Sequence, residues 1–178
     1  MATASSAPLQ PDAPQRGGPG SADRSHPRLM LAGWLLLCLA PAALGALFPP
    51  DAWFRALDKP AFQPPNWVFG PVWTTLYVLM AIAAWRIWRQ PSSSRRTFAL
   101  AVFLVQLALN AAWTPTFFGA HQIGLALLVQ IALDAAVLTC WWQFRQLDRV
   151  AGWLLVPYLT WLSLATALGI ALLRLNGA

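Results

Sequence analysis

Three residues of one apolar segment carry side chains that could recognise a ligand. Gln106, Asn110 and Trp113 stand in QLALNAAWTPTFFG, residues 106–119, spaced by four and then by three positions. On a helix this spacing places all three on one face. Amides can orient a bound molecule through hydrogen bonds, and an indole ring can stack on it. The alternative is a hydrogen bond to a neighbouring membrane helix, worth about 0.6 kcal/mol on average, and both interpretations stay open.

A carboxylate in the next apolar segment is the second unusual group. Asp134 has no Lys or Arg in its own segment or in the preceding one. Because a charge within a membrane is costly, we expect Asp134 to be neutral or hydrogen-bonded inside a helix bundle. His121 stands at a tight turn, where we expect it to be solvated or interfacial. The sequence holds no catalytic Ser/His/Asp set with a supporting motif, no phosphate-binding Gly-rich loop and no His/Cys cluster.

The composition decides what must position these side chains. Of 178 residues, 58% are hydrophobic and only 10% are charged, whereas a soluble domain carries about 25% charged residues. We therefore predict an integral membrane protein. The net charge of +6 lies in no basic polar domain, so we expect no nucleic-acid partner. The two cysteines are too few for a disulfide framework.

Five apolar runs have the length of about 20 residues that a membrane-spanning helix needs. They predict an all-α membrane protein, a five-transmembrane-helix bundle within residues 29–176. A polar tail rich in Pro, Gly and Ser precedes it, and we expect residues 1–28 to be disordered. The runs cover residues 29–48, 67–88, 97–118, 121–144 and 150–173.

The basic residues predict the orientation of this multi-pass bundle. With five spans, nine of the twelve Lys and Arg side chains fall on the face of the N terminus and three on the other face. Basic residues accumulate on the cytoplasmic side of membrane proteins. We therefore expect a cytoplasmic N terminus, with the loop 49–66 facing away from the cytoplasm.

Tryptophan and proline mark particular positions along the spans. Of the eleven tryptophans, those near span ends fit an aromatic belt at the membrane interface. Trp73, Trp113 and Trp161 lie within spans, where rings either pack or line a cavity. Pro41 is expected to interrupt the first span and Pro115 to bend the third near its end. The prolines of residues 59–66 predict either a rigid lid or an ordinary stiff connector.

Small residues recur along the third span and predict a close helix contact. Ala108 and Ala112 are four residues apart, and Ala101 precedes them. Such spacing lets membrane helices approach closely. We expect a homodimer to which this face contributes.

Three segments together resemble the TspO/MBR family of tryptophan-rich sensory proteins, which is related to the mitochondrial translocator protein. They are WFRALDKPAFQPPNWVFGPVWTTLY (53–77), QLALNAAWTPTFFG (106–119) and QLDRVAGWLLVPYLTWLSLATAL (146–168), and the resemblance covers roughly residues 30–176. It implies five transmembrane helices, usually dimeric, around a cavity closed by the first loop. The family's ligand positions fall on Trp53, Phe54, Trp73, Gln106, Asn110, Trp113, Trp161, Ala165 and Leu168.

The sequence departs from the family at several places. Phe54 stands where many members have Tyr, and Phe62 replaces a frequent Trp. Gly169 and Ile170 stand where many have Asn and Tyr. The pattern proposed for sterol recognition needs a Tyr before its final basic residue, and LGIALLR, residues 168–174, has none.

The resemblance implies a membrane receptor or carrier that binds porphyrins such as haem, and sterol-like lipids, for sensing or transport. Its partners would be this ligand, membrane lipid and a second copy of the chain, with no metal or other cofactor. One alternative is an enzyme that degrades bound porphyrin in the light, using the cavity tryptophans. Another is a passive bundle that modulates a partner complex.

Overall fold

The computed structural model describes residues 27–177, and within them every regular element is a helix. Five helices are long and apolar enough to cross a membrane, which confirms the predicted fold class. The tail predicted for residues 1–28 lies outside the described residues, except that Pro27 and Arg28 begin the first helix. The elements are α1 (Pro27–Gly45), α2 (Ala52–Ala56), α3 (Asn66–Trp88), α4 (Ser94–Thr114), the π-helical turn η2 (Pro115–Gly119), α5 (Ile123–Leu147), α6 (Arg149–Leu154) and α7 (Val156–Asn176).

Each predicted apolar run corresponds to one span of the bundle. The third span is α4 continued by η2, and the fifth is α6 continued by α7. α5 packs against α4 and α7, while α1 packs against α3 and α4. Alanines on the inner face of α3 have no exposed surface. The same is true of Phe103 of α4 and Phe144 of α5. The small side chains of α3 thus leave room for rings from its neighbours.

The prolines shape the spans in three ways. Pro41 does not interrupt α1, contrary to the prediction: the helix continues from Pro27 to Gly45, although Pro41 has no N–H to donate to the carbonyl of Leu37. Lost backbone bonds are tolerated in membrane helices when the local structure adjusts. Pro115 follows the last residue of α4 and begins the π-helical turn, so the predicted position near a helix end is confirmed. Pro157 has no N–H to donate to the carbonyl of Trp153, and here α6 and α7 are separated at Leu155.

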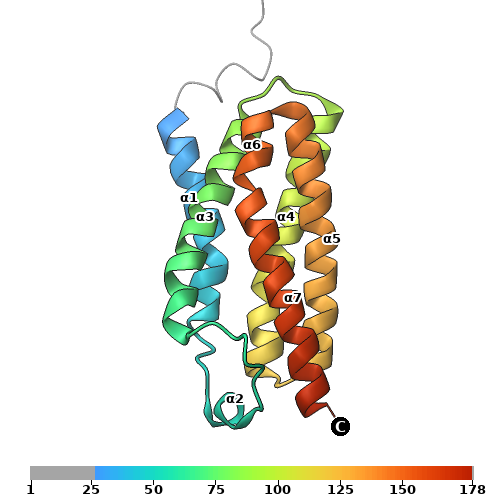
Figure 1. The fold of residues 1–178 in the computed structure, drawn as a ribbon. Helices are drawn as coiled ribbons and strands as arrows, with labels where there is room; N and C mark the ends of the chain where they lie inside the picture. The colour runs from blue at the N-terminus through green and yellow to red at the C-terminus, as the bar shows by residue number, and fades with distance from the viewer. Residues whose placement is uncertain (1–26, 178) are drawn as a thin grey trace, which may run out of the picture.

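The two ends of the bundle are built differently (Figure 1). At one end, α2 and its flanking residues 46–65 cross the ends of the long helices beside the C terminus. We call this the loop end. At the other end lie α6, the start of α1 and the connection between α3 and α4. We call it the arginine end, because Arg86, Arg145 and Arg149 lie there.

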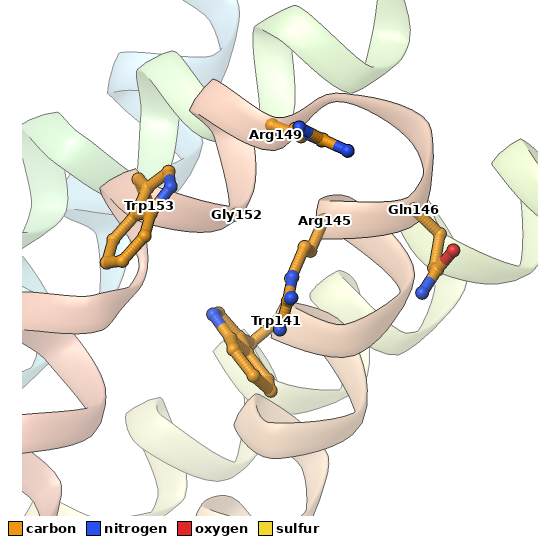
Figure 2. Close-up of a pocket in the computed structure, with 6 residues that line it drawn as sticks. All are labelled: Trp141, Arg145, Gln146, Arg149, Gly152 and Trp153. Atoms are coloured by element: carbon orange, nitrogen blue, oxygen red, sulfur yellow. The ribbon is translucent and has the colours of Figure 1, made fainter.

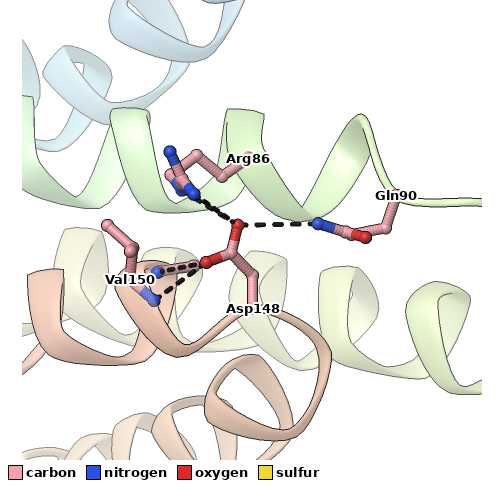
Figure 3. Close-up of polar contacts among 5 residues, drawn as sticks. Arg86, Gln90, Asp148 and Val150 are labelled. Carbon is pink, nitrogen blue, oxygen red and sulfur yellow. Dashed lines mark hydrogen bonds and ion pairs between the residues drawn. The ribbon is translucent and has the colours of Figure 1, made fainter.

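One carboxylate organises the arginine end (Figure 3). The Asp148 side chain accepts hydrogen bonds from the backbone amides of Val150 and Ala151, at 2.8 and 3.1 Å, and so caps α6. Its other oxygen lies 2.8 Å from Nη2 of Arg86 on α3. The cap and the ion pair together hold the corner between α5 and α6 against α3.

Candidate functional site

A chain of buried polar groups crosses the middle of the bundle. The Tyr77 hydroxyl of α3 donates to Oδ1 of Asn110 at 2.9 Å, and Nδ2 of Asn110 donates to the Tyr158 hydroxyl of α7 at 3.0 Å. The Tyr158 hydroxyl donates in turn to Oε1 of Gln106 at 3.3 Å. Gln106 is 1% exposed and Asn110 is 6% exposed. The two amides predicted from the sequence therefore hydrogen-bond between helices α3, α4 and α7.

Sequence reasoning missed the two hydroxyl partners. Tyr77 and Tyr158 are the only tyrosines of the chain. A buried tyrosine hydroxyl needs a partner, and in a membrane a buried amide is the obvious one. Tyr77 also lies four residues after Trp73, on the same face of α3. That spacing was the signal from which this position could have been found.

Partly buried rings lie beside this polar chain, between α3 and α7. The Trp73 ring centroid is 5.3 Å from that of Tyr77 and 6.0 Å from that of Tyr158. One turn nearer the loop end, Phe69 meets Trp161 edge to face at 5.5 Å. α3 and α7 diverge towards the loop end (Figure 1), and these rings bridge them. The structure thus brings four predicted site residues together here: Trp73, Gln106, Asn110 and Trp161.

A second aromatic cluster forms at the loop end around Phe117 of η2. Trp113 stacks on the Phe117 ring at 5.0 Å, and Trp53 and Phe54 meet its edge at 5.6 and 6.1 Å. Phe54 also packs on Phe118 at 5.2 Å. Phe117 is buried, and the cluster is completed by Leu57 after α2, Leu172 of α7, and Ile123 and Ala126 of α5. Three further predicted residues, Trp53, Phe54 and Trp113, are therefore grouped apart from the four above.

Polar contacts fasten the loop over this second cluster. The Trp53 ring stacks on the imidazole of His121 at 4.3 Å, and Nε2 of His121 lies 3.0 Å from Oδ2 of Asp51. The amide of Phe54 donates to Asp51 at 3.0 Å, which caps α2. This amide, together with His121, lowers the pKa of Asp51 below its usual value. Asn176 at the end of α7 exchanges two hydrogen bonds with the backbone of residue 58.

The last predicted positions, Ala165 and Leu168, lie on α7. Leu168 is buried and Ala165 is partly buried. Between them, the hydroxyl of Thr166 donates to Asp134, and Gln130 donates to the other oxygen of the same carboxylate at 2.8 Å. Asp134 is thus hydrogen-bonded inside the bundle, as predicted. A recess of about 480 Å³ lies elsewhere, at the arginine end, and none of the predicted site residues lines it.

The family suggested by the sequence has five spans and a first loop that covers a cavity. This chain has five spans, a loop held by aromatic rings, and tryptophans beside a buried polar chain. The model of the TspO/MBR family matches residues 34–175.

The chain belongs to the TspO/MBR family.

Relatives of this TspO/MBR protein occur in bacteria and mammals. It is 46% identical over 143 residues to the tryptophan-rich sensory protein of Cereibacter sphaeroides, covering 80% of this chain and 89% of that one. It is 38% identical over 148 residues to protein CrtK of Rhodobacter capsulatus, covering 83% and 92%. It is 41% identical over 126 residues to the human translocator protein, covering 70% and 75%. Family membership and five apolar spans establish a multi-pass membrane protein.

Proposed function

We propose that this TspO/MBR protein is a membrane receptor or carrier for porphyrins, with the ligand held between α3 and α7. The observation that carries the proposal is the set of partly buried rings beside a buried polar chain. Trp73 and Trp161 have ring surface left exposed, while Asn110 lies behind them with its amide already oriented. Binding sites for flat apolar molecules combine such rings with a few placed polar groups.

The energetic roles differ between the two kinds of group. Each tryptophan offers a face for offset stacking, worth roughly 0.5–1.5 kcal/mol beyond the area that it buries. Among the described residues, Asn110 donates one amide hydrogen, to Tyr158, so its second is available to a ligand. A hydrogen bond of this kind contributes about 1 kcal/mol and orients the ring system.

The loop end supplies the cover of this site. The residues around α2 are fastened to the turn after η2 through Asp51 and His121, and to α7 through Asn176. Relatives named for a sensory role and for translocation support sensing or transport as the purpose of binding. Sterol-like lipids are a second ligand class for the same site, although the final segment lacks the tyrosine of the proposed sterol pattern.

Titration of the purified protein with protoporphyrin, followed by tryptophan fluorescence, tests the proposal. Trp161→Phe is expected to weaken binding severalfold, because a smaller ring stacks less well. Trp142→Phe is the matched control, since Trp142 is 50% exposed near the end of α5 and has no contact with the rings of the proposed site. If both variants bind protoporphyrin with the affinity of the wild type, and Trp161→Phe only has a lower thermal stability, then the Trp161 ring packs and does not bind the ligand. The same titration in light and in darkness detects product if the protein degrades porphyrin.

We also propose that the arginine end, and with it the N terminus, faces the cytoplasm. The arginines of the 86–96 and 145–149 segments lie at this one end (Figure 1), which supports the orientation predicted from the sequence. A cysteine introduced at Ala56 should then react with a membrane-impermeant reagent added outside intact cells. Reaction only from the cytoplasmic side would reverse the orientation.

A homodimer through α4 is the third proposal. Ala101, Ala108 and Ala112 are all exposed on this helix, and Val105 on the same face is 55% exposed. Small residues let a second helix approach, so that packing drives association. Ala108→Leu should lower the crosslinked dimer fraction in detergent, whereas Leu128→Ala, on an exposed part of α5, should not. An unchanged fraction in Ala108→Leu would exclude this face.

A further inference from the structure

A recess at the arginine end is unused by the proposed porphyrin site. Its volume is about 480 Å³, and it opens between the last turns of α5 and the short helix α6 (Figure 2). It lies at the end of the bundle opposite to the loop (Figure 1). The lining residues are Trp141, Arg145, Gln146, Arg149, Gly152 and Trp153.

Gly152 explains why the recess has this shape. A Cβ atom at position 152 would lie 2.8 Å from Cβ and 2.9 Å from Cα of Arg145. Contacts this short do not occur between real side chains, so only glycine lets α6 lie directly on the end of α5. This close approach places Arg149 and Trp153 of α6 across from Arg145 and Trp141 of α5 (Figure 2). The recess is thus a fixed consequence of the packing of two helices.

The charge of the recess is uncompensated within the described part of the chain. No ion pair there involves Arg145 or Arg149. The nearby carboxylate, Asp148, is already used by Arg86 and by two backbone amides of α6 (Figure 3). The other described carboxylates lie in the loop end or within the α5 span. Two guanidinium groups therefore face one recess without an acidic partner from residues 27–177.

The rings of the recess belong to the membrane interface. The guanidinium of Arg145 lies over the Trp141 ring at 5.4 Å, which orients it. Trp153 is 73% exposed, more than expected of an indole unless lipid or a ligand covers it. Tryptophans at span ends lie at the level of the lipid headgroups. The two arginines therefore lie at the same depth in the membrane as the phospholipid phosphates.

We infer that this recess binds the phosphate group of an anionic phospholipid, with Arg145 and Arg149 holding the phosphate and Trp141 and Trp153 flanking the headgroup. Guanidinium groups recognise phosphate through paired, charge-assisted hydrogen bonds. Basic pockets between membrane helices bind anionic headgroups for this reason. A free phosphate shares this chemistry, but the position at a span end favours the lipid. The inference depends neither on the porphyrin site nor on which end faces the cytoplasm.

The test measures thermal unfolding of the full chain in detergent while phosphatidylglycerol or phosphatidylcholine is added. Binding to the folded state raises the unfolding midpoint. Phosphatidylglycerol is expected to raise it and phosphatidylcholine is not. In Arg145→Gln/Arg149→Gln the apparent affinity for phosphatidylglycerol should fall roughly tenfold or more, because each arginine near the headgroups contributes to the attraction. Arg149→Gln alone should give a smaller loss and serves if the double variant does not fold.

The matched control is Arg28→Gln/Arg89→Gln, which removes the same charge from exposed positions of the same end. It should keep the phosphatidylglycerol response. An equal loss in this control would show general surface attraction and overturn the site. An unchanged response in both recess variants would overturn it as well. If inorganic phosphate or glycerol phosphate stabilises the wild type as strongly as phosphatidylglycerol does, the lipid assignment is overturned.

Discussion

The loop end and the arginine end each depend on an aspartate with two tasks. Asp51 caps α2 and pairs with His121, while Asp148 caps α6 and pairs with Arg86. The Asp148 side chain is 10% exposed, whereas that of Asp51 is 44% exposed. A guanidinium keeps its charge at every accessible pH, but an imidazole is charged only when protonated. The same local motif thus pairs the aspartate with a cation that is always charged at one end, and with a side chain that is charged only when protonated at the other.

The ends differ in what else supports them. Beside Asp51, the rings of Trp53, Phe54 and Trp113 pack on Phe117, so that apolar contacts carry the loop. α6 has no comparable aromatic cluster among the described residues. Its Ala151 packs in the main core, and the ion pair of Asp148 with Arg86 adds a polar contact to α3. From this difference we expect the loop end to tolerate loss of its aspartate better than the arginine end. The following substitutions test that expectation.

Phe117→Ala is expected to have the largest effect. It removes the buried ring on which four other rings of the loop end pack, and such a change in a core costs about 3 kcal/mol. The thermal midpoint in detergent should fall, and hydrogen exchange should increase in residues 46–65 before it increases in α6. Increased exchange confined to α6 would contradict the assignment of the loop to this cluster.

Asp148→Ala should have the next largest effect, about 2 kcal/mol. It leaves Arg86 without its partner and α6 without its cap, and partial exposure of Arg86 reduces the cost below that of a fully buried pair. Asp148→Asn keeps a capping side chain and loses only the charge, so it should be less destabilising. Unfolding midpoints of both variants, beside Asp51→Ala, measure the comparison directly. If Asp51→Ala costs as much as Asp148→Ala, the proposed difference between the ends is wrong.

The pH dependence of the loop end should be the smallest effect. Because the amide of Phe54 and then His121 lower the pKa of Asp51, its ionised form stabilises the folded loop above the usual value of 3.8. This contribution is lost as the pH falls through the lower pKa of the folded state. Pepsin should therefore cleave Asp51→Asn faster than the wild type above that range, and the two rates should converge at lower pH. A rate ratio that does not change with pH would contradict the role of the Asp51 charge.

Local sequence determined much of this protein. Lipid offers the backbone no hydrogen-bonding partner, so an apolar run of sufficient length must form a helix, and five runs gave five spans within a few residues of the predicted bounds. Periodicity placed Gln106 and Asn110 on one inward face, where the structure has them. The cost of an unpartnered carboxylate in a membrane predicted that Asp134 is hydrogen-bonded inside the bundle. The sequence did not predict that Gln130 and Thr166 are its partners.

Only the tertiary structure decided which side chains meet across helices. Tyr77 and Tyr158 are separated by 81 positions, and their hydroxyls meet on Asn110 only because of how α3, α4 and α7 are rotated and staggered. The same holds for Asp51 with His121, for Arg86 with Asp148, and for the recess beneath α6. Helix periodicity fixes the direction of a side chain relative to its own axis. The partner that it reaches depends on packing between axes, to which side chains far apart in the sequence all contribute.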